Sequence, residues 1–341
     1  MNKIILLTNY KDIIPQRNNE IEGLNLNLIS EVLDANNFSV QEITIHAFIA
    51  LLEETDSFEG VYFYYTSSQY QIYKSFILDV LIQITLRGGV LIPELRHFMA
   101  HENKNFQELE KIRLSIRSPY GVPVGTYEEG VERLKNATYP VVIKKHTGFR
   151  SRNVRLANNF SEGKKVLSKL LEKNFLFDMD SLYFMYRRLK NKGHYPKKFG
   201  KVIIQEFIPD LTHDWKILVL GDRCLGGKRY VRKNDFRASG SKLYEMEEDP
   251  PENVLSFALK CKQELNCPNA SLDISENKGD LQLLEYQTMH FAILGGDPDY
   301  YFEKEDSVWH KREIIHEIEY YMGEGISSHI KNIDKNNSPK A

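Results

Sequence analysis

The sequence predicts an α/β protein with a parallel sheet in its N-terminal part and antiparallel strands in its C-terminal part. In the N-terminal part, short apolar runs alternate with amphipathic segments, the arrangement of a parallel sheet with helical crossovers. In the C-terminal part, strand-like segments follow one another through short turns instead. The chain has 341 residues, of which 42% are hydrophobic, enough for two or three folded domains without disulfides.

Four short apolar runs predict the buried strands of the parallel sheet. The first run is unbroken, as expected for a strand that helices cover on both faces. The predicted elements are strand Lys3–Asn9, helix Leu24–Leu33, strand Val40–Ile45, strand Gly60–Tyr65, helix Tyr70–Leu86 and strand Val90–Ile92. No GxGxxG motif follows the first strand, so the sequence does not favour a dinucleotide site in this part.

The middle of the chain is predicted to begin with a helix, followed by a segment rich in turn-forming residues. A strand that leads into a loop comes next. These elements are helix Asn105–Ser115, the turn-rich segment 118–130, strand Val141–Lys144, the loop His146–Asn153, strand Val154–Leu156 and the helical segments Gly163–Glu172 and Ser181–Leu189.

The C-terminal part is predicted to be antiparallel because two short turns, at Gly221-Asp222 and at Asn277–Gly279, join its strands. The predicted elements are strands Val202–Ile204, Trp215–Leu220 and Arg223–Val231, helix Asn253–Leu265, strands Ala270–Ser275 and Asp280–Tyr286, and a closing helix Lys311–Gly323. The final segment, NIDKNNSPKA, is expected to be frayed.

Composition argues against several classes of protein. The net charge of −2 gives no basic field for nucleic acid. The three cysteines form no CxxC pair, which fits a reducing cytosol and gives no zinc signature. The apolar run at the N-terminus is too short for a signal peptide, and no run of about 18 apolar residues occurs elsewhere. We therefore expect a cytoplasmic protein that binds neither nucleic acid nor a membrane.

The strongest functional signal is a pair of carboxylates, Asp273 and Glu285, on two strands joined by a turn. Gln287 lies two residues beyond Glu285 and therefore on the same face of its strand. Three such oxygen-bearing side chains are typical of a site for Mg²⁺ held against phosphates. We expect the two carboxylates to repel each other when no cation is bound. A solvated hairpin with polar edges is the alternative interpretation.

A second signal is a lysine, Lys144, at the end of an apolar strand and before a loop that carries Thr147, Gly148 and Ser151. A lysine in this place can reach a phosphate as a point charge, while loop amides can surround the phosphate oxygens. The adjacent Lys145 should point to the opposite face of the strand. Taken alone, a solvated lysine at a strand end is the more frequent explanation.

A third signal is the apolar strand that ends in Gln205–Ile208 before Pro209. Backbone groups that leave a strand at such a point can pair with the edge of an adenine, and Phe207 can help to line its pocket. Polar and basic residues with the character of an anion site follow: Asp214, Lys216, Arg229, Arg232 and Arg237. A solvated basic face is the alternative for any one of them.

Three other motifs do not favour a site. The segment Gly221–Lys228 lacks the P-loop lysine at the required position. His97 and His101 are spaced like zinc ligands on a helix but lack the HExxH glutamate. Ser239 and Ser241 have no evident His–Asp partners for a hydrolytic triad.

Taken in order, these motifs resemble the ATP-grasp superfamily, and especially its branch of glutathione synthetases and ribosomal-protein glutamate ligases. The resemblance covers about residues 97–290. It implies an N-terminal half-Rossmann domain over 1–96, a small lid domain over 97–205, an antiparallel C-terminal domain over 206–330 and a flexible tail over 331–341. ATP is then held between the lid and the C-terminal domain.

The resemblance also implies roles for individual residues. Lys104 and Lys144 are the phosphate lysines, the loop His146–Asn153 covers the phosphates, and Glu206 and Ile208 contact adenine through their backbone. It implies that ATP is bound by Lys104, Lys144, Thr147, Gly148, Ser151, Gln205, Glu206, Phe207, Ile208, Asp214 and Lys216. It implies that metal is bound by Asp273, Glu285 and Gln287, and that Arg229 and Arg237 act at the transferred phosphoryl group.

The resemblance implies a carboxylate–amine ligase that forms an acyl phosphate from ATP and then an amide bond. Its cofactors are ATP and two Mg²⁺ ions, with Mn²⁺ as an alternative, and its substrates are a small carboxylate and an amine, such as amino acids or a peptide. A homodimer is expected. The family's usual asparagine is replaced by Gln287, and the phosphate loop has one glycine, Gly148. Two alternatives therefore stay open: a phosphotransferase that releases a phosphorylated product, and a nucleotide-binding pseudoenzyme.

Overall fold

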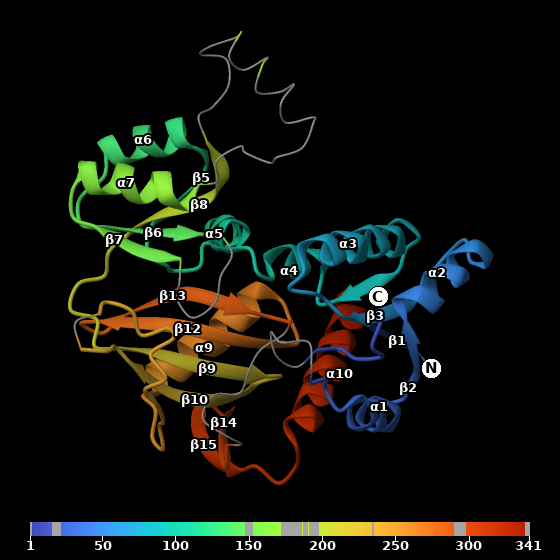
Figure 1. Cartoon of the computed structure of the whole chain (residues 1–341). Coiled ribbons are helices and arrows are strands. Elements are labelled where there is room, and N and C mark those ends of the chain that lie inside the picture. Colours follow the sequence, from blue (N-terminus) through green and yellow to red (C-terminus); the bar gives the residue numbers. More distant parts are fainter. Residues whose placement is uncertain are drawn as a thin grey trace.

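In the part of the chain that the structure describes, the strands form three sheets, which follow one another along the chain (Figure 1). The computed structural model describes residues 2–15, 22–146, 153–171, 186, 190, 198–233, 235–289 and 298–337. Within these residues, no helix is long and apolar enough to cross a membrane. The predicted segment Ser181–Leu189 lies outside the described residues except for Tyr186, as does most of the loop His146–Asn153.

The N-terminal sheet is parallel, as predicted, with strand order β2-β1-β3-β4. Its strands are β1 (Asn2–Thr8), β2 (Phe38–Thr44), β3 (Val61–Tyr65) and β4 (Val90–Ile92). Leu6 and Leu7 are both buried although they point to opposite faces, because helices cover the sheet on both sides. The unbroken apolar runs therefore predicted this sheet correctly.

Helices α2 (Ile45–Glu54) and α3 (Gln71–Leu86) pack on one face of this sheet. Helix α1 (Leu26–Ala35) packs on the other face. The sequence analysis missed α2, which follows β2 without a loop. Thr44 ends the strand and caps the helix, because its side chain accepts a hydrogen bond from the backbone of Ala47.

The closing helix is not where the sequence analysis predicted it. The start of the predicted helix Lys311–Gly323 belongs to β15 (Val308–Glu313), which pairs with β14 (Tyr300–Glu305) and packs Trp309 against the core of the large sheet. The helix itself, α10, spans Ile318–Asn337.

Helix α10 also corrects the expectation of a flexible tail over 331–341, because residues 331–337 form its last turns. Ile326 and Ile330 pack beside α1 against the N-terminal sheet. Figure 1 shows α10 next to α1 and β1, so the last helix completes the core of the first sheet.

The small sheet is antiparallel and has the order β5-β8-β6-β7. Its elements are β5 (Gly121–Thr126), α6 (Tyr127–Lys135), β6 (Val141–Lys145), β7 (Val154–Ala157), α7 (Phe160–Leu170) and β8 (Phe199–Glu206). The predicted turn-rich segment is in fact β5 and the start of α6. Pro123 is tolerated because β5 is an edge strand, and a capping box of Thr126 and Glu129 begins the helix.

The large sheet has the order β13-β12-β9-β10-β14-β15, and β11 pairs with β10. Its remaining strands are β9 (His213–Leu220), β10 (Arg223–Tyr230), β11 (Tyr244–Met246), β12 (Asn269–Asn277) and β13 (Asp280–Gln287). Helix α9 (Glu252–Leu265) covers one face, over Trp215 and Leu272. Polar side chains of the same strands therefore lie on the opposite face.

Two short helices join the N-terminal sheet to the small sheet. They are α4 (Leu95–Ala100) and α5 (Lys104–Arg113), and α5 contacts β5, β8 and β13. Helix α5 therefore bridges the small and the large sheet (Figure 1).

We expect the replacement of Ile330 by Ala to lower the free energy of unfolding by about 3 kcal/mol, because it removes a fully buried side chain from the N-terminal core. Ser328→Ala, on the exposed side of the same helix, should change it by less than about 0.5 kcal/mol. Urea unfolding measures both. Equal, small effects would show that this part of α10 does not stabilise the protein.

Candidate active site

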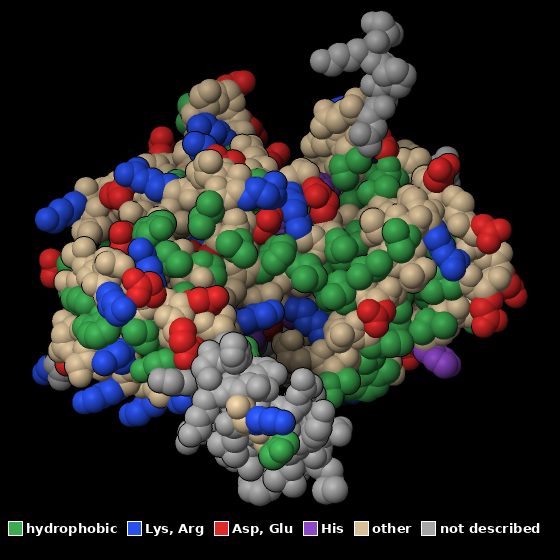
Figure 2. All heavy atoms as spheres, turned by 90° about the horizontal axis from the view of Figure 1, so that it is seen from above, with side chains coloured by type: hydrophobic (Ala, Val, Ile, Leu, Met, Phe, Trp, Pro, Cys, Tyr) green, Lys and Arg blue, Asp and Glu red, His purple; other side chains and the backbone are tan. Residues whose placement is uncertain are grey.

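An open cavity of about 1090 Å³ lies between the small and the large sheet, with α5 at its back. Seen from above, Lys and Arg side chains gather around a hollow near the middle of the molecular face (Figure 2). The predicted site residues that line the cavity are Lys104, Lys144, Gln205, Glu206, Phe207, Ile208, Asp214, Lys216, Arg229, Arg237, Asp273, Glu285 and Gln287. Residues Thr147, Gly148 and Ser151 lie outside the described residues.

A network of buried charges forms the floor of the cavity on the large sheet. Arg229 donates two hydrogen bonds to Asp214, at 2.9 and 2.6 Å, and one to Asp273 at 2.8 Å. Lys216 donates to Asp273 at 2.7 Å and to the side-chain oxygen of Gln287 at 3.3 Å. The strands bring these residues together, because Asp214 is paired with Arg229 and Lys216 with Asp273.

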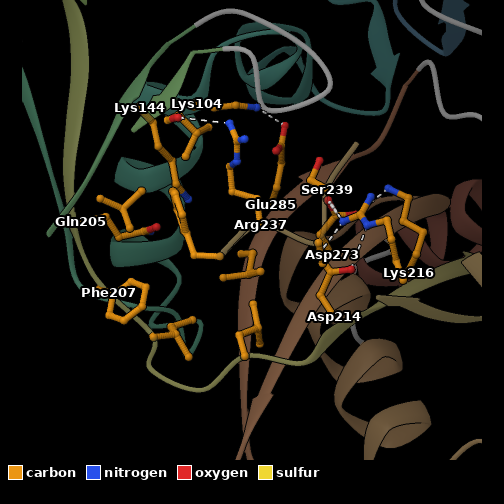
Figure 3. A pocket seen from close by; sticks show the side chains of 18 of the residues that line it. Lys104, Lys144, Gln205, Phe207, Asp214, Lys216, Arg237, Ser239, Asp273 and Glu285 are labelled. Carbon is orange, nitrogen blue, oxygen red and sulfur yellow. Dashed lines mark hydrogen bonds and ion pairs between the residues drawn. The ribbon is translucent and has the colours of Figure 1, made fainter. Parts of the chain in front are cut away.

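The second predicted carboxylate, Glu285, is paired with Asp273 across β12 and β13, as the hairpin predicted. It forms an ion pair with Lys104, which is the first residue of α5. In Figure 3 this pair lies beside the Asp273 network, and Gln205 and Phe207 lie on the opposite side of the cavity. The site is therefore lined by alternating charges rather than by one sign of charge.

The network fixes the charge state of its members. Burial opposes the ionisation of Asp273, but Arg229 and Lys216 outweigh it and hold the pKa of this carboxyl well below its ordinary value. Burial also opposes the ionisation of Glu285, whose pKa is lowered by Lys104. Burial raises the pKa of Asp214 to about 6, because the attraction of Arg229 does not fully offset it.

The two carboxylates do repel each other, because Asp273 acts to raise the pKa of Glu285, but cationic side chains outweigh this repulsion. Each has a cationic side chain as its partner, Arg229 and Lys216 for Asp273 and Lys104 for Glu285. The ammonium groups of Lys104 and Lys216 thus neutralise the same carboxylates that a metal ion would neutralise.

The residues that could hold a metal ion are Asp273, Glu285 and Gln287. Among the described residues, no group of three His, Cys, Asp or Glu side chains could hold a metal. Two carboxylates and one amide oxygen on adjacent strands are nevertheless a donor set that suits a hard cation such as Mg²⁺, which usually keeps several of its waters.

On the opposite wall, Lys144 and Val142 line the cavity from β6 and Lys145 does not, as the alternation of the strand predicted. Burial lowers the pKa of Lys144 to about 8, although Glu108 opposes the shift. A phosphate placed near Lys144 would stabilise its charged form.

The segment Gln205–Ile208 forms the inner end of the cavity, where β8 ends at Glu206. The amide of Glu206 donates to the carbonyl of Tyr120 at 3.0 Å, so only its carbonyl could contact a base. Within the described part of the chain, the amide of Ile208 has no acceptor. The rings of Phe207 and Phe236 meet edge-on, with their centroids 6.2 Å apart, and they make this end of the cavity apolar.

The two remaining arginines differ in position. Arg237 lines the cavity, is paired with Asp235 at 2.8 Å and donates to the carbonyl of Val154 in β7 at 3.4 Å. Arg232 does not line the cavity and bonds instead to the carbonyls of Gly240 and Ser241.

The sequence analysis missed several residues that line the cavity. They are Glu102, Val142, Val154, Leu211, Phe236, Ala238, Ser239 and Leu284. Val142 could have been found from its spacing of two residues from Lys144 on one strand. The residues of the loop before Gly240 follow no period, so no pattern identifies them.

Known proteins resemble this chain in sequence over part of its length and in fold. No protein-family model matches the chain. α-Aminoadipate–LysW ligase LysX of Saccharolobus solfataricus is 31% identical over 180 residues, which are 52% of this chain and 57% of LysX, so the chain matches little more than half the length of this relative.

Two solved structures resemble the whole chain. D-cycloserine synthetase DcsG has a TM-score of 0.53 at 9% identity, with 96% of this chain and 99% of DcsG covered. ATP-grasp ligase PsnB, solved with a minimal precursor, Mg and ADP, has a TM-score of 0.50 at 14% identity, with 96% of each chain covered. These likenesses confirm the predicted fold class.

The lowered pKa of Lys144 predicts a pH dependence of stability. Between its folded pKa of about 8 and its ordinary value of 10.5, the unfolded chain binds more protons at this position, so the free energy of unfolding should rise with pH. Lys144→Met should raise the free energy of unfolding by about 1–2 kcal/mol at pH 7. It should also make the increase of the free energy of unfolding with pH smaller than in the wild-type protein.

Urea unfolding of the wild-type protein and of Lys144→Met, from pH 7 to 10.5, measures how the free energy of unfolding depends on pH. Lys145→Met, on the opposite face of the same strand, is the matched control and should keep the wild-type slope. An unchanged slope in Lys144→Met would contradict the buried position of the ammonium group.

Proposed function

We propose that this chain, which has the ATP-grasp fold, is an ATP-dependent ligase that joins a carboxylate to an amine through an acyl phosphate. The observation that carries the proposal is the composition of one cavity. The space between the small and the large sheet has one apolar end and is lined by Lys104 and Lys144. It is also lined by Asp273, which Arg229 holds, and by Glu285. This is the set of groups that binding a nucleoside triphosphate beside a second anion requires.

In this proposal, the base of ATP lies against Gln205–Ile208, and the phosphates extend toward Lys104 and Lys144. Both ammonium groups come from elements that the fold holds in place, β6 and the first turn of α5. Fixed positive charges favour the transfer of the terminal phosphoryl group, because they need little reorganisation as negative charge moves. The transfer breaks the bond between the terminal phosphorus and the bridging oxygen of ATP and leaves ADP.

The metal of this proposal is Mg²⁺, held by Asp273, Glu285 and Gln287, whose oxygens suit it. When bound, it would neutralise phosphate charge. Lys104 and Lys216, which lie beside these carboxylates, would then be able to bind anionic substrate groups.

Arg229 and Arg237 bind the substrate carboxylate, which attacks the terminal phosphorus to give an acyl phosphate. The nitrogen of the amine then forms a bond to the acyl carbon. Phosphate leaves with the electron pair of the broken C–O bond, and the amine loses a proton. The site must exclude water during this sequence, because water would hydrolyse the acyl phosphate.

The substrate class that we propose is an amino acid or a peptide. LysX is named as a ligase of α-aminoadipate and LysW, and PsnB was solved with a precursor peptide.

Asp273→Asn and Glu285→Gln should each lower turnover about 100-fold or more, because each removes a charged oxygen donor from the phosphate end of the site. Asp273→Asn should also lower the free energy of unfolding by about 1–3 kcal/mol, since it leaves Lys216 and Arg229 with less negative charge. Release of ADP at saturating Mg²⁺ and urea unfolding measure the two effects.

Glu276→Gln is the control on the same hairpin, because Glu276 accepts a hydrogen bond from Trp215 away from the cavity. It should retain turnover. Normal Mg²⁺-dependent turnover in both site variants would disprove the proposed role of the carboxylates.

The reaction itself is tested by a panel of amino acids and peptides with Mg²⁺ and ATP, in which ADP is measured with and without hydroxylamine. Hydroxylamine is a small amine that converts an acyl phosphate into a hydroxamate, so a ligase should form one and release ADP faster. A stable phosphorylated product formed without any amine would identify a phosphotransferase instead. No ADP release with any pair would favour a nucleotide-binding protein without catalysis.

A further inference from the structure

A buried ion pair lies directly behind the inner end of the cavity. Lys111 of α5 donates to Glu108 at 2.8 Å, and these residues are only 1% and 4% exposed. Lys111 also donates to the carbonyls of Leu283 and Leu284 in β13, at 3.4 and 3.2 Å. Neither charged residue lines the cavity, and the proposed reaction uses neither.

The ion pair holds Glu108 in one position. The three hydrogen-bond donors of Lys111 have three acceptors, and any other orientation of the ammonium group would break at least one of these hydrogen bonds. On the other side, Glu108 lies so close to Gly121 of β5 that a Cβ atom there would be 2.9 Å from its Oε2. Glycine at position 121 therefore leaves the space that the carboxylate needs.

Glu108 in turn orients the side chain of Gln205, which lines the cavity from the end of β8. The Gln205 amide nitrogen donates to Glu108 at 3.3 Å and to the carbonyl of Pro119 at 3.5 Å. The reverse orientation would bring the amide oxygen against two acceptors, which is unfavourable. The oxygen of Gln205 is therefore the atom that remains for the cavity.

We propose that Lys111 and Glu108 are positioning residues that select the base of the nucleotide by fixing Gln205 with its oxygen toward the cavity. A hydrogen-bond acceptor there favours a base that carries a donor on this edge, such as the 6-amino group of adenine. It opposes the 6-oxo group of hypoxanthine or guanine, because two acceptors would face each other. The inference rests on the proposed function, in that ATP binds in this cavity with its base at Gln205–Ile208.

The test measures the dissociation constants of ATP and inosine triphosphate by calorimetry, since the two nucleotides differ at the 6-position of the purine. We expect the wild-type protein to bind ATP about tenfold more tightly or better. Lys111 and the Gln205 amide bond to the same oxygen of Glu108, so Glu108→Leu removes the acceptor that holds the Gln205 amide. The Gln205 amide should then be free to turn, and the preference should fall about fivefold or more.

Glu110→Gln is the matched control, because Glu110 lies on the same helix and pairs with Arg96 and Arg113 instead. It should keep the wild-type preference. Damage to the fold weakens both nucleotides together, so the ratio of the two dissociation constants separates positioning from a merely structural role. Gln205→Leu removes the acceptor while keeping the ion pair, and it should lower the preference even if Glu108→Leu does not fold.

A wild-type preference in a folded Glu108→Leu protein, or in Gln205→Leu, would overturn the inference and leave the proposed function intact. Equal binding of both nucleotides by the wild-type protein would also overturn the inference and leave the proposed function intact. If the wild-type protein bound neither nucleotide, the proposed function would fail and this inference with it.

Discussion

The guanidinium group of Arg229 is the contact on which the floor of the site depends. It lies on β10 and bonds to Asp214 on β9 and to Asp273 on β12, so one side chain connects three strands. Carboxylates buried this deeply are stable only when a cation or several donors accompany them. Because the register of the strands places each charge beside its partner, the sheet builds this network as it forms, and the charges have fixed positions before any substrate arrives.

Helix α5 connects the network of paired charges on the large sheet with the small sheet. At its start Lys104 holds Glu285, and one to two turns later Glu108 and Lys111 connect Gln205 of β8 with the backbone of β13. The two ends of the cavity, one charged and one apolar, are thus set by a single element that contacts both sheets. In the proposed function, the length of this rigid helix sets the distance between the base and the phosphates of the nucleotide.

The sequence predicted those features that depend on local pattern. Apolar runs identified the parallel sheet, and a hairpin placed Asp273 beside Glu285. Strand β5 was missed because its glycines and proline are typical of turns and are tolerated only at a sheet edge. Glu108 and Lys111 were missed for a different reason: in KNFQELEKIR they have the pattern of a solvated helix face, and only the strands packed around α5 bury them. Side chains that depend on such tertiary partners leave no signal in a single sequence.

The packing of α10 on the first sheet has a consequence for the order in which the chain folds during synthesis. β1 and α1 leave the ribosome well before Ile326 and Ile330, which cover the same face as α1. The N-terminal sheet therefore keeps an uncovered apolar face while the other two sheets are made. During that interval, the nascent chain presents a surface of the kind that chaperones bind, and the parallel sheet is completed only after the two sheets that follow it in the chain.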